Sequence, residues 1–255
     1  MKIVVLVKHV PDPEEPAVLA GEDRRIVREG GVLSETDSRA IAVAEELRGD
    51  GDTVTALTMG PALAEPSLRK ALAAGADDAV HVLDDRLAGA DALTTARVLA
   101  AAVTRLDADL VLAGNLATDG MGGMVPAMLA ELLGLPHVTH VEDVSLDADV
   151  LSARRVSGPV ARTVSAPVPL VASVVEQAAE PRIPNFMGLR SARTKLVEVL
   201  GLDDLGLDVP RAAWRVTGAE PAAERTRAEL VTDTDEAVER IVDLLTSTGT
   251  IGAAT

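Results

Sequence analysis

The chain has 255 residues, with 24 Lys and Arg against 40 Asp and Glu, so its formal net charge is −16. This charge argues against nucleic acid or an anionic membrane as the main partner, because both repel an acidic surface. The chain has no Cys, which excludes disulfides, thiolate metal sites and a cysteine nucleophile, and its one Trp, one Phe and absent Tyr leave the core to aliphatic side chains.

The first 135 residues alternate between short apolar runs and amphipathic segments. Apolar runs typical of buried parallel strands lie at 2–8, 53–58, 78–82 and 110–113. Helices are predicted at 40–47, from about 61 to 74, at 90–106 and from Pro126 onward. Four strand–helix repeats predict an α/β fold, a parallel sheet with helices on both faces.

The stretch from Asp109 to Leu133 is the most informative in the chain. A buried strand is followed by a glycine-rich loop, and a helix then begins with Pro126 in its first turn, where a missing N–H costs nothing. Backbone N–H groups at such a helix start suit a phosphate. The spacing matches neither common phosphate-loop pattern, and no Lys follows the glycines. In a nucleotide site Asp119 could cap the turn or accept from a ribose hydroxyl. An ordinary strand-to-helix connection, with Asp119 as a simple cap, therefore stays open.

Several loops are predicted to meet at one edge of the sheet. Ligands of parallel sheets lie at the carboxyl ends of the strands, near the point where the strand order reverses. The loops that begin there are Lys8-His9, Met59-Gly60-Pro61 and 114–125, and the capped helix start at 36–39 forms a fourth wall. We interpret His9 as a loop residue and His81 as a packed one.

The second half of the chain has a different texture. Four short runs at 138–146, 150–156, 162–166 and 170–175 predict an antiparallel edge or extension. A loop with two prolines follows, and a helix is expected at about 235–245. Between them the chain is acidic and contains apolar residues with no evident core of their own: Leu205, Val209, Trp214 and Val216.

Five segments, in this order, carry a resemblance to a known family: KIVVLVKHVPDP, ALTMGP, ALAAGADDAVHV, AGNLATDGMGGMVPAMLAELLGLPHVTHV and EPRIPNFMGLRSARTK. With them, nearly the whole chain resembles the β subunit of electron transfer flavoprotein. The resemblance implies an adenine nucleotide alpha-hydrolase-like domain at 1–199, with the antiparallel extension, and a C-terminal arm at 200–255 that wraps an α subunit.

The family also implies a function and its partners. Its heterodimer carries electrons on an FAD of the α subunit, from acyl-CoA dehydrogenases of fatty acid oxidation and related enzymes to a quinone oxidoreductase or another acceptor. The β subunit usually holds a structural AMP and makes or breaks no substrate bonds, so we expect no catalytic residue. Flavin-bifurcating members hold a second FAD in place of AMP. A stand-alone ATP-binding α/β protein is the alternative from a different class.

Matching segments assigns the expected AMP site residue by residue. The residues expected to form this site are Leu6, Thr36, Asp37, Ser38, Arg39, Met59, Gly114, Asn115, Thr118, Asp119, Gly120, Met121, Gly122, Gly123, Met124 and Val125. Thr36 replaces an Asn found in many members, and Met124 replaces the Gln of bifurcating relatives, which favours AMP.

The resemblance also implies a partner-docking segment, made of Pro184, Asn185, Phe186, Met187 and Leu189. Phe186 is expected to anchor in an apolar pocket on a dehydrogenase, although from the residues alone it reads as a core residue. No metal site is expected, since His137 and His140 lack further ligands. Arg162 lies where it could face the flavin of the α subunit. The N-terminal apolar run is broken by Lys8 and His9, so we expect a cytoplasmic protein without direct membrane insertion.

Overall fold

The structure is a computed structural model that describes residues 1–22, 24–208, 212–214, 216–220 and 228–251. The chain divides into two compact units, Met1–Gly218 and Ala219–Thr255. The first contains the sheet and both predicted sites. The second contains α6 (Thr234–Ser247), whose first turn is capped by Asp233, since its carboxylate accepts a hydrogen bond from the Glu236 N–H at 2.9 Å.

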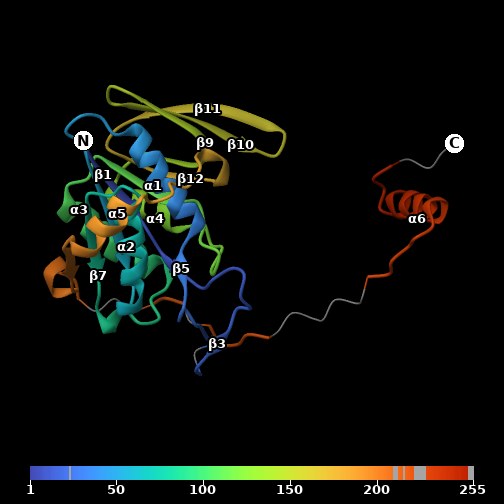
Figure 1. Cartoon of the computed structure of the whole chain (residues 1–255), viewed down its shortest axis with the longest axis horizontal. Helices are drawn as coiled ribbons and strands as arrows, with labels where there is room; N and C mark the ends of the chain where they lie inside the picture. Colours follow the sequence, from blue (N-terminus) through green and yellow to red (C-terminus); the bar gives the residue numbers. More distant parts are fainter. Residues whose placement is uncertain (23, 209–211, 215, 221–227, 252–255) are drawn as a thin grey trace. The chain divides into compact units, whose positions relative to one another are not determined.

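In the described part of the first unit, one nine-stranded sheet has the order β11-β10-β9-β12-β8-β1-β6-β7-β13 (Figure 1). The strands are β1 (Lys2–Leu6), β6 (Thr53–Met59), β7 (Asp78–Val82), β8 (Leu110–Gly114), β9 (His137–Asp147), β10 (Val150–Ser157), β11 (Val160–Pro167), β12 (Leu170–Val174) and β13 (Val197–Leu200). From β12 to β13 every neighbouring pair is parallel. The predicted α/β fold with a parallel sheet is confirmed.

Helices cover both faces of this sheet. One apolar core joins it to α1 (Glu35–Leu47), α2 (Glu65–Ala74) and α5 (Phe186–Thr194), through side chains such as Ile41, Leu68 and Ala192. A second core joins the other face to α3 (Ala92–Leu106) and α4 (Val125–Leu133), through Leu99 and Leu129. Single 3-10 turns connect elements at η1 (Ala62–Ala64), η2 (Asp85–Leu87), η3 (Glu176–Ala178) and η4 (Asp203–Leu205).

The segment between β1 and α1 forms two small antiparallel pairs. They are β2 (His9–Val10) with β5 (Val32–Leu33), and β3 (Leu19–Ala20) with β4 (Arg25–Ile26). His9 is buried, with Nδ1 2.8 Å from Ser67 Oγ and Nε2 3.0 Å from the Arg28 carbonyl oxygen. The interpretation of His9 as a loop residue was therefore wrong: its ring connects this segment to α2. His81 is packed as predicted, with Nε2 2.9 Å from the Gly60 carbonyl oxygen.

The antiparallel prediction for the second half was right for three strands and wrong for the fourth. β9, β10 and β11 form an antiparallel ribbon. β12 instead lies between β8 and β9 and is parallel to both. All five of its residues are buried, because it has a neighbour on each side and a helix layer above and below. Four of the five residues are apolar, and a nearly continuous apolar run is typical of such a strand.

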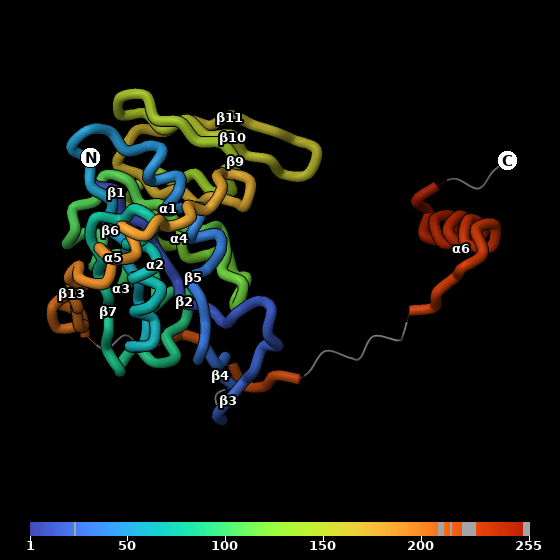
Figure 2. Tube along the Cα trace, viewed as in Figure 1, coloured from blue at the N-terminus to red at the C-terminus, as the bar shows by residue number. Residues whose placement is uncertain are grey.

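The sheet ends at β13, a strand that the sequence analysis did not predict. β13 pairs with β7, and α5 lies beside α2 (Figure 2). Leu200 and Leu202 are buried, and Leu205 is partly buried against the second core, so the expectation that Leu205 lacks a core was wrong. Trp214 and Val216 are exposed as expected, and Val209 lies outside the described residues. Residues 200–255 as an arm around a partner stay a prediction.

Among the described residues, no helix combines the length and the apolar character that crossing a bilayer requires.

Candidate nucleotide site and docking helix

The strand order reverses beside β1. β1 lies between β6 and β8 in the sheet. The chain runs from β1 to α1 on one face of the sheet, whereas it runs from β8 to α4 on the opposite face. The carboxyl ends of β1 and β8 therefore diverge to opposite faces. In open parallel sheets this is the place where ligands bind.

The buried carboxylate of Asp37 connects these two strand ends. Its Oδ2 accepts a hydrogen bond from the Lys8 N–H at 2.8 Å, and its Oδ1 accepts one from the Gly114 N–H at 3.1 Å. These two hydrogen bonds join the ends of β1 and β8, and we call them the Asp37 bracket. Burial raises the pKa of Asp37 to about 7, against the two backbone N–H groups, which lower it.

Thr36 completes this contact from the first turn of α1. Its Oγ1 donates to the Leu116 carbonyl oxygen at 2.8 Å, which fixes the start of the glycine-rich loop. Gly114 is required here, because a Cβ at this position would overlap Thr36 Oγ1 and Asp37 Oδ1. The first turn of α1 thus determines where the loop leaves β8.

Asp119 lies in the loop and forms a buried ion-pair centre. Its Oδ1 accepts from Lys8 Nζ at 2.7 Å, and its Oδ2 accepts from Arg28 Nη2 at 2.6 Å and Nε at 3.0 Å. The Asp119 side chain is 1% exposed, whereas those of Lys8 and Arg28 are 43% and 30% exposed. Burial raises the pKa of Asp119, but the bonds and charges of the two cations outweigh it and leave the pKa below its ordinary value.

We call Lys8, Arg28, Thr36, Asp37, Gly114 and Asp119 the strand-end cluster. The loop at Lys8 was predicted to meet the glycine loop, and the bond to Asp119 agrees with that. Arg28 was missed, because it lies 91 residues from Asp119 and no local pattern links them. Asp119, for which a cap or a ribose contact was considered, uses both oxygens inside the protein instead.

The glycine loop itself is open to solvent. Residues 120–124 are exposed, and α4 begins directly after them at Val125, with Pro126 in its first turn. Gly123 has φ +59°, where a side chain would be strained, and Met121 has φ +46°. The first N–H groups of α4 have no partners within the helix, so they face this loop.

The remaining predicted site residues divide into two groups. Leu6, Thr118 and Met59 lie at strand ends or in the loop. Asn115 and Arg39 instead bind protein groups. Asn115 Nδ2 is 3.1 Å from His140 Nε2, its Oδ1 accepts from Ser173 Oγ at 3.3 Å, and Arg39 donates to the Ala179 carbonyl oxygen at 2.8 Å. Ser38 Oγ donates to the Ser34 carbonyl oxygen at 3.3 Å.

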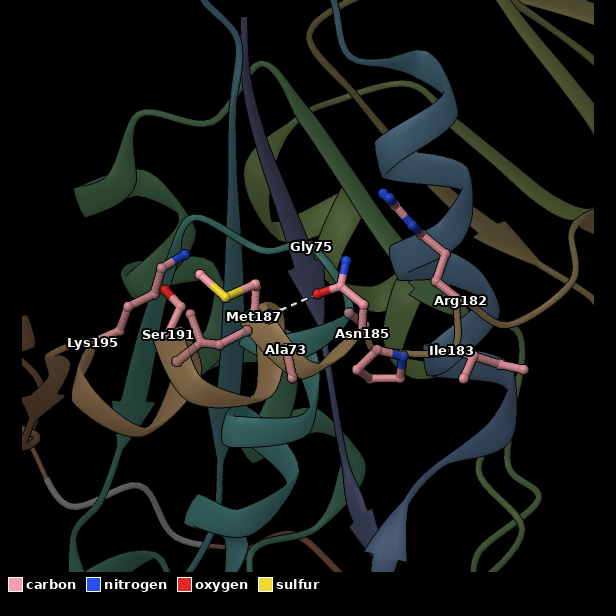
Figure 3. A pocket seen from close by; sticks show the side chains of 12 residues that line it. Ala73, Gly75, Arg182, Ile183, Asn185, Met187, Ser191 and Lys195 are labelled. Carbon is pink, nitrogen blue, oxygen red and sulfur yellow. Dashed lines mark hydrogen bonds between the residues drawn. The ribbon is translucent and has the colours of Figure 1, made fainter.

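The predicted docking segment is a helix start and not a loop. Asn185 caps α5, since its Oδ1 accepts from the Gly188 N–H at 2.8 Å, and Phe186 is the first helical residue. Phe186 is 77% exposed and Met187 67% exposed, so the reading of Phe186 as a core residue is excluded. After the role predicted for it, we call the segment 183–194, which is α5 with the three residues before it, the docking helix. Between it and α2 lies a groove of about 430 Å³, with Met187, Ser191 and Lys195 on one side and Ala73 and Gly75 on the other (Figure 3).

The described residues contain no group of three or more His, Asp or Glu side chains arranged to hold a metal ion.

The fold is that of an open-sheet α/β protein, and proteins of this class bind ligands where the strand order reverses. The family described as "Electron transfer flavoprotein domain" matches residues 24–205. "Electron transfer flavoprotein subunit beta" of Mycobacterium tuberculosis is 40% identical over 257 positions, 95% of this chain and 97% of the relative. The protein of the same name from Thermoanaerobacterium thermosaccharolyticum is 32% identical, over 97% of this chain and 98% of its own.

A third relative carries a different name. "Caffeyl-CoA reductase-Etf complex subunit CarD" of Acetobacterium woodii is 31% identical over 81% of this chain and 80% of its own length. The chain belongs to the electron transfer flavoprotein family, and within it to the β subunits.

Proposed function

We propose that this chain pairs with an electron transfer flavoprotein α subunit, holds one AMP at the strand-end cluster and docks dehydrogenases through α5. Electrons then travel on the FAD of the α subunit to an acceptor such as a quinone oxidoreductase. The chain acts as scaffold and docking subunit. Its own residues bind and orient, and they make or break no substrate bond.

The observation that carries the nucleotide proposal is the bracket at Asp37. One buried carboxylate binds the N–H groups of Lys8 and Gly114 and so fixes both strand ends beneath the exposed glycine loop. The loop offers small residues at the N-terminal end of α4, which suits the close approach of a phosphate. The spare donors of Lys8 and Arg28, beside Asp119, favour an anionic ligand.

The residues present fit AMP better than a nucleotide that reacts. An adenylate supplies no redox chemistry, so its role is to join the loop to the ends of β1 and β8. Asp119 is committed to two cations, which leaves it unsuited as a general base. The name of the Acetobacterium relative, a subunit of a reductase–Etf complex, supports docking of an acyl-CoA-type oxidoreductase.

The experiment is to co-express the chain with an α subunit, purify the complex and quantify the nucleotides that acid releases. We expect one FAD and one AMP for each heterodimer. Two FAD and no AMP would replace this proposal with flavin bifurcation. A bound triphosphate with ATP turnover would favour the stand-alone ATP-binding alternative, and a chain that forms no complex with an α subunit would contradict the assignment.

A matched pair of variants assigns the nucleotide to its loop. Gly123→Val places a β-branched side chain at φ +59°, where only Gly is comfortable, and is expected to release the nucleotide. Gly158→Val makes the same change at φ +57° in the turn between β10 and β11, away from the loop, and should retain it. Equal loss in both variants would mean that the nucleotide responds to general destabilisation.

A further inference from the structure

The docking helix is short and exposes most of its apolar side chains. α5 has nine residues, all within the described part of the chain, and of these Ala192 alone is buried. Phe186, Met187 and Leu189 are 77%, 67% and 50% exposed. Isolated helices shorter than about 12 residues are marginal in water, and apolar burial normally supplies the rest of their stability. Something other than burial must keep α5 folded with its apolar side chains outward.

Arg69 of α2 supplies contacts of that kind at one end. Its Nη1 donates to the Ala192 carbonyl oxygen at 2.9 Å and to the Lys195 carbonyl oxygen at 2.6 Å. The last carbonyl groups of a helix have no partners within the helix, so this guanidinium is a C-terminal cap from a neighbouring helix. Glu65, one turn earlier in α2, accepts from Arg69 Nη2 at 2.8 Å and orients the guanidinium.

Two further contacts fix α5 on α2. Lys195 Nζ donates to the Ala76 carbonyl oxygen at 2.8 Å, just beyond the C-terminal end of α2. At the other end of α5, a Cβ on Gly188 would lie 2.8 Å from the Ala73 carbonyl oxygen, which is closer than a Cβ contact allows. Gly188 therefore sets the distance between the two helices, and Asn185 caps the first turn.

From these contacts we infer that Arg69 and Gly188 are positioning residues for docking. They hold α5 preformed on α2, so that Phe186 and Met187 face a partner, while Arg69 and Gly188 do not touch the partner. The inference rests on the proposed function of α5. A preformed docking helix reduces the ordering cost of binding, so affinity depends on residues outside the interface. Flexible presentation of the same apolar residues would weaken binding.

The first experiment needs the heterodimer but no dehydrogenase. Amide hydrogen exchange of residues 189–195 is compared between the parent heterodimer and its Arg69→Met and Gly188→Ala variants. Hydrogen bonds from a charged donor are worth enough for loss of Arg69 to increase local opening by about tenfold or more. Gly188→Ala should also increase exchange, although Ala favours helix over Gly, because the added methyl group forces the helices apart. Unchanged exchange in both variants would overturn the inference.

The second experiment measures docking. An acyl-CoA dehydrogenase, reduced by its acyl-CoA, reduces the heterodimer, and the rate is recorded against dehydrogenase concentration. Arg69→Met is expected to raise the KM for the dehydrogenase about tenfold with kcat unchanged, because the electron-transfer step itself is untouched. Arg69→Lys keeps the charge but lacks the planar guanidinium that reaches Glu65 and both carbonyl groups together, so its KM should lie between those of the parent and Arg69→Met. An unchanged KM in Arg69→Met overturns the inference.

Matched controls and one double variant separate the possible failures. Arg97→Met removes an exposed Arg from α3, on the opposite face of the sheet, and Gly49→Ala adds a methyl group that makes an ordinary 3.5 Å contact. Both should leave KM and exchange unchanged. In a Phe186→Ala background, Arg69→Met should add little further loss, because Arg69 acts through the apolar face. If Phe186→Ala alone has no effect, the docking proposal fails, while the exchange result still decides the positioning of α5.

Discussion

The two candidate functional regions are both fixed by side chains that bind backbone groups of another segment, but in one the side chain accepts hydrogen bonds and in the other it donates them. At the strand ends, the buried carboxyl group of Asp37 accepts hydrogen bonds from two backbone N–H groups. At the docking helix, a cation, Arg69, donates to two carbonyl groups, and its side chain is 31% exposed. Hydrogen bonds to a buried carboxyl group hold their partners rigidly and depend on the protonation of that group. Those from an exposed guanidinium are weaker and respond to salt, so the two regions should fail differently.

The largest loss of stability is expected from a substitution at Gly114, where the Asp37 bracket leaves no room for a Cβ atom. Gly114→Ala places a Cβ against Thr36 and Asp37, and because the sheet and α1 are closely packed there, neither can move freely. We expect the free energy of unfolding to fall by about 3 kcal/mol, measured by urea denaturation. Gly218→Ala, with nothing within 4 Å, is the control and should change little. A Gly114→Ala variant as stable as the parent would mean that the strand ends are loosely joined.

The bracket should also give stability a distinctive pH dependence. The pKa of Asp37 is raised from 3.8 to about 7, so between these values the folded chain keeps a proton that the unfolded chain has released. This group therefore makes the unfolding free energy fall as pH rises from 3.8 to about 7. Asp37→Asn lacks that fall.

In Asp37→Asn an amide N–H₂ faces a backbone N–H. At pH 5 we expect a loss of about 2 kcal/mol relative to the parent, and a smaller difference at pH 8. Urea denaturation at the two pH values gives the comparison. A loss that is equal at both pH values would place the pKa of Asp37 in its ordinary range.

The stability that Asp119 contributes should change with pH in the opposite direction from that of Asp37. The pKa of Asp119 is lowered, so the stability that it contributes is present above the ordinary carboxyl range and is lost as pH falls through its folded value. Asp119→Asn is expected to cost about 1 kcal/mol at pH 7, since Lys8 and Arg28 are partly solvated. The difference from the parent should shrink in acid and in high salt. Thermal melts across pH and salt test this, and a salt-independent loss would argue against an ion pair.

The smallest global effect is expected at the docking helix. Asn185→Ala removes the cap to Gly188 and should destabilise α5 locally by about 1 kcal/mol. Because α5 buries Ala192 alone of its nine described residues, global unfolding should change less than local exchange. Amide exchange and urea denaturation on the same samples compare the two. A global loss as large as the local one would show that α5 and the sheet unfold together.

The sequence predicted the elements whose signals are local. The run Asp78–Val82 has the bounds of β7, and the parallel strands at Lys2 and Leu110 were found in the same way. β12 was assigned to an antiparallel extension together with the three short runs before it, although Leu170–Val174 is apolar except at Ser173, which is typical of a buried parallel strand. Its position between β8 and β9 depends on long-range pairing that chain order conceals.

The candidate site divides along the same line. The glycine loop and the helix start at Thr36 and Asp37 carry local patterns and were predicted as neighbours. Arg28 and Arg69 were not, because each binds residues about 90 to 126 positions away and neither belongs to a motif. The docking segment was predicted as a loop, with Pro184 at its start and Pro181 before it, whereas Asn185, three residues before Gly188, was the available signal for a helix cap.

The position of β12 also bears on how the chain folds during synthesis. β8 carries the glycine loop at its end, and one edge of β8 stays unpaired until residues 170–174 have been made. β9 to β11 are synthesised in that interval and can already form their hairpins, since their contacts are local. A nascent chain that stops before residue 170 therefore exposes one edge of an apolar strand, a kind of surface that chaperones bind and from which aggregation begins. Insertion of β12 closes that edge.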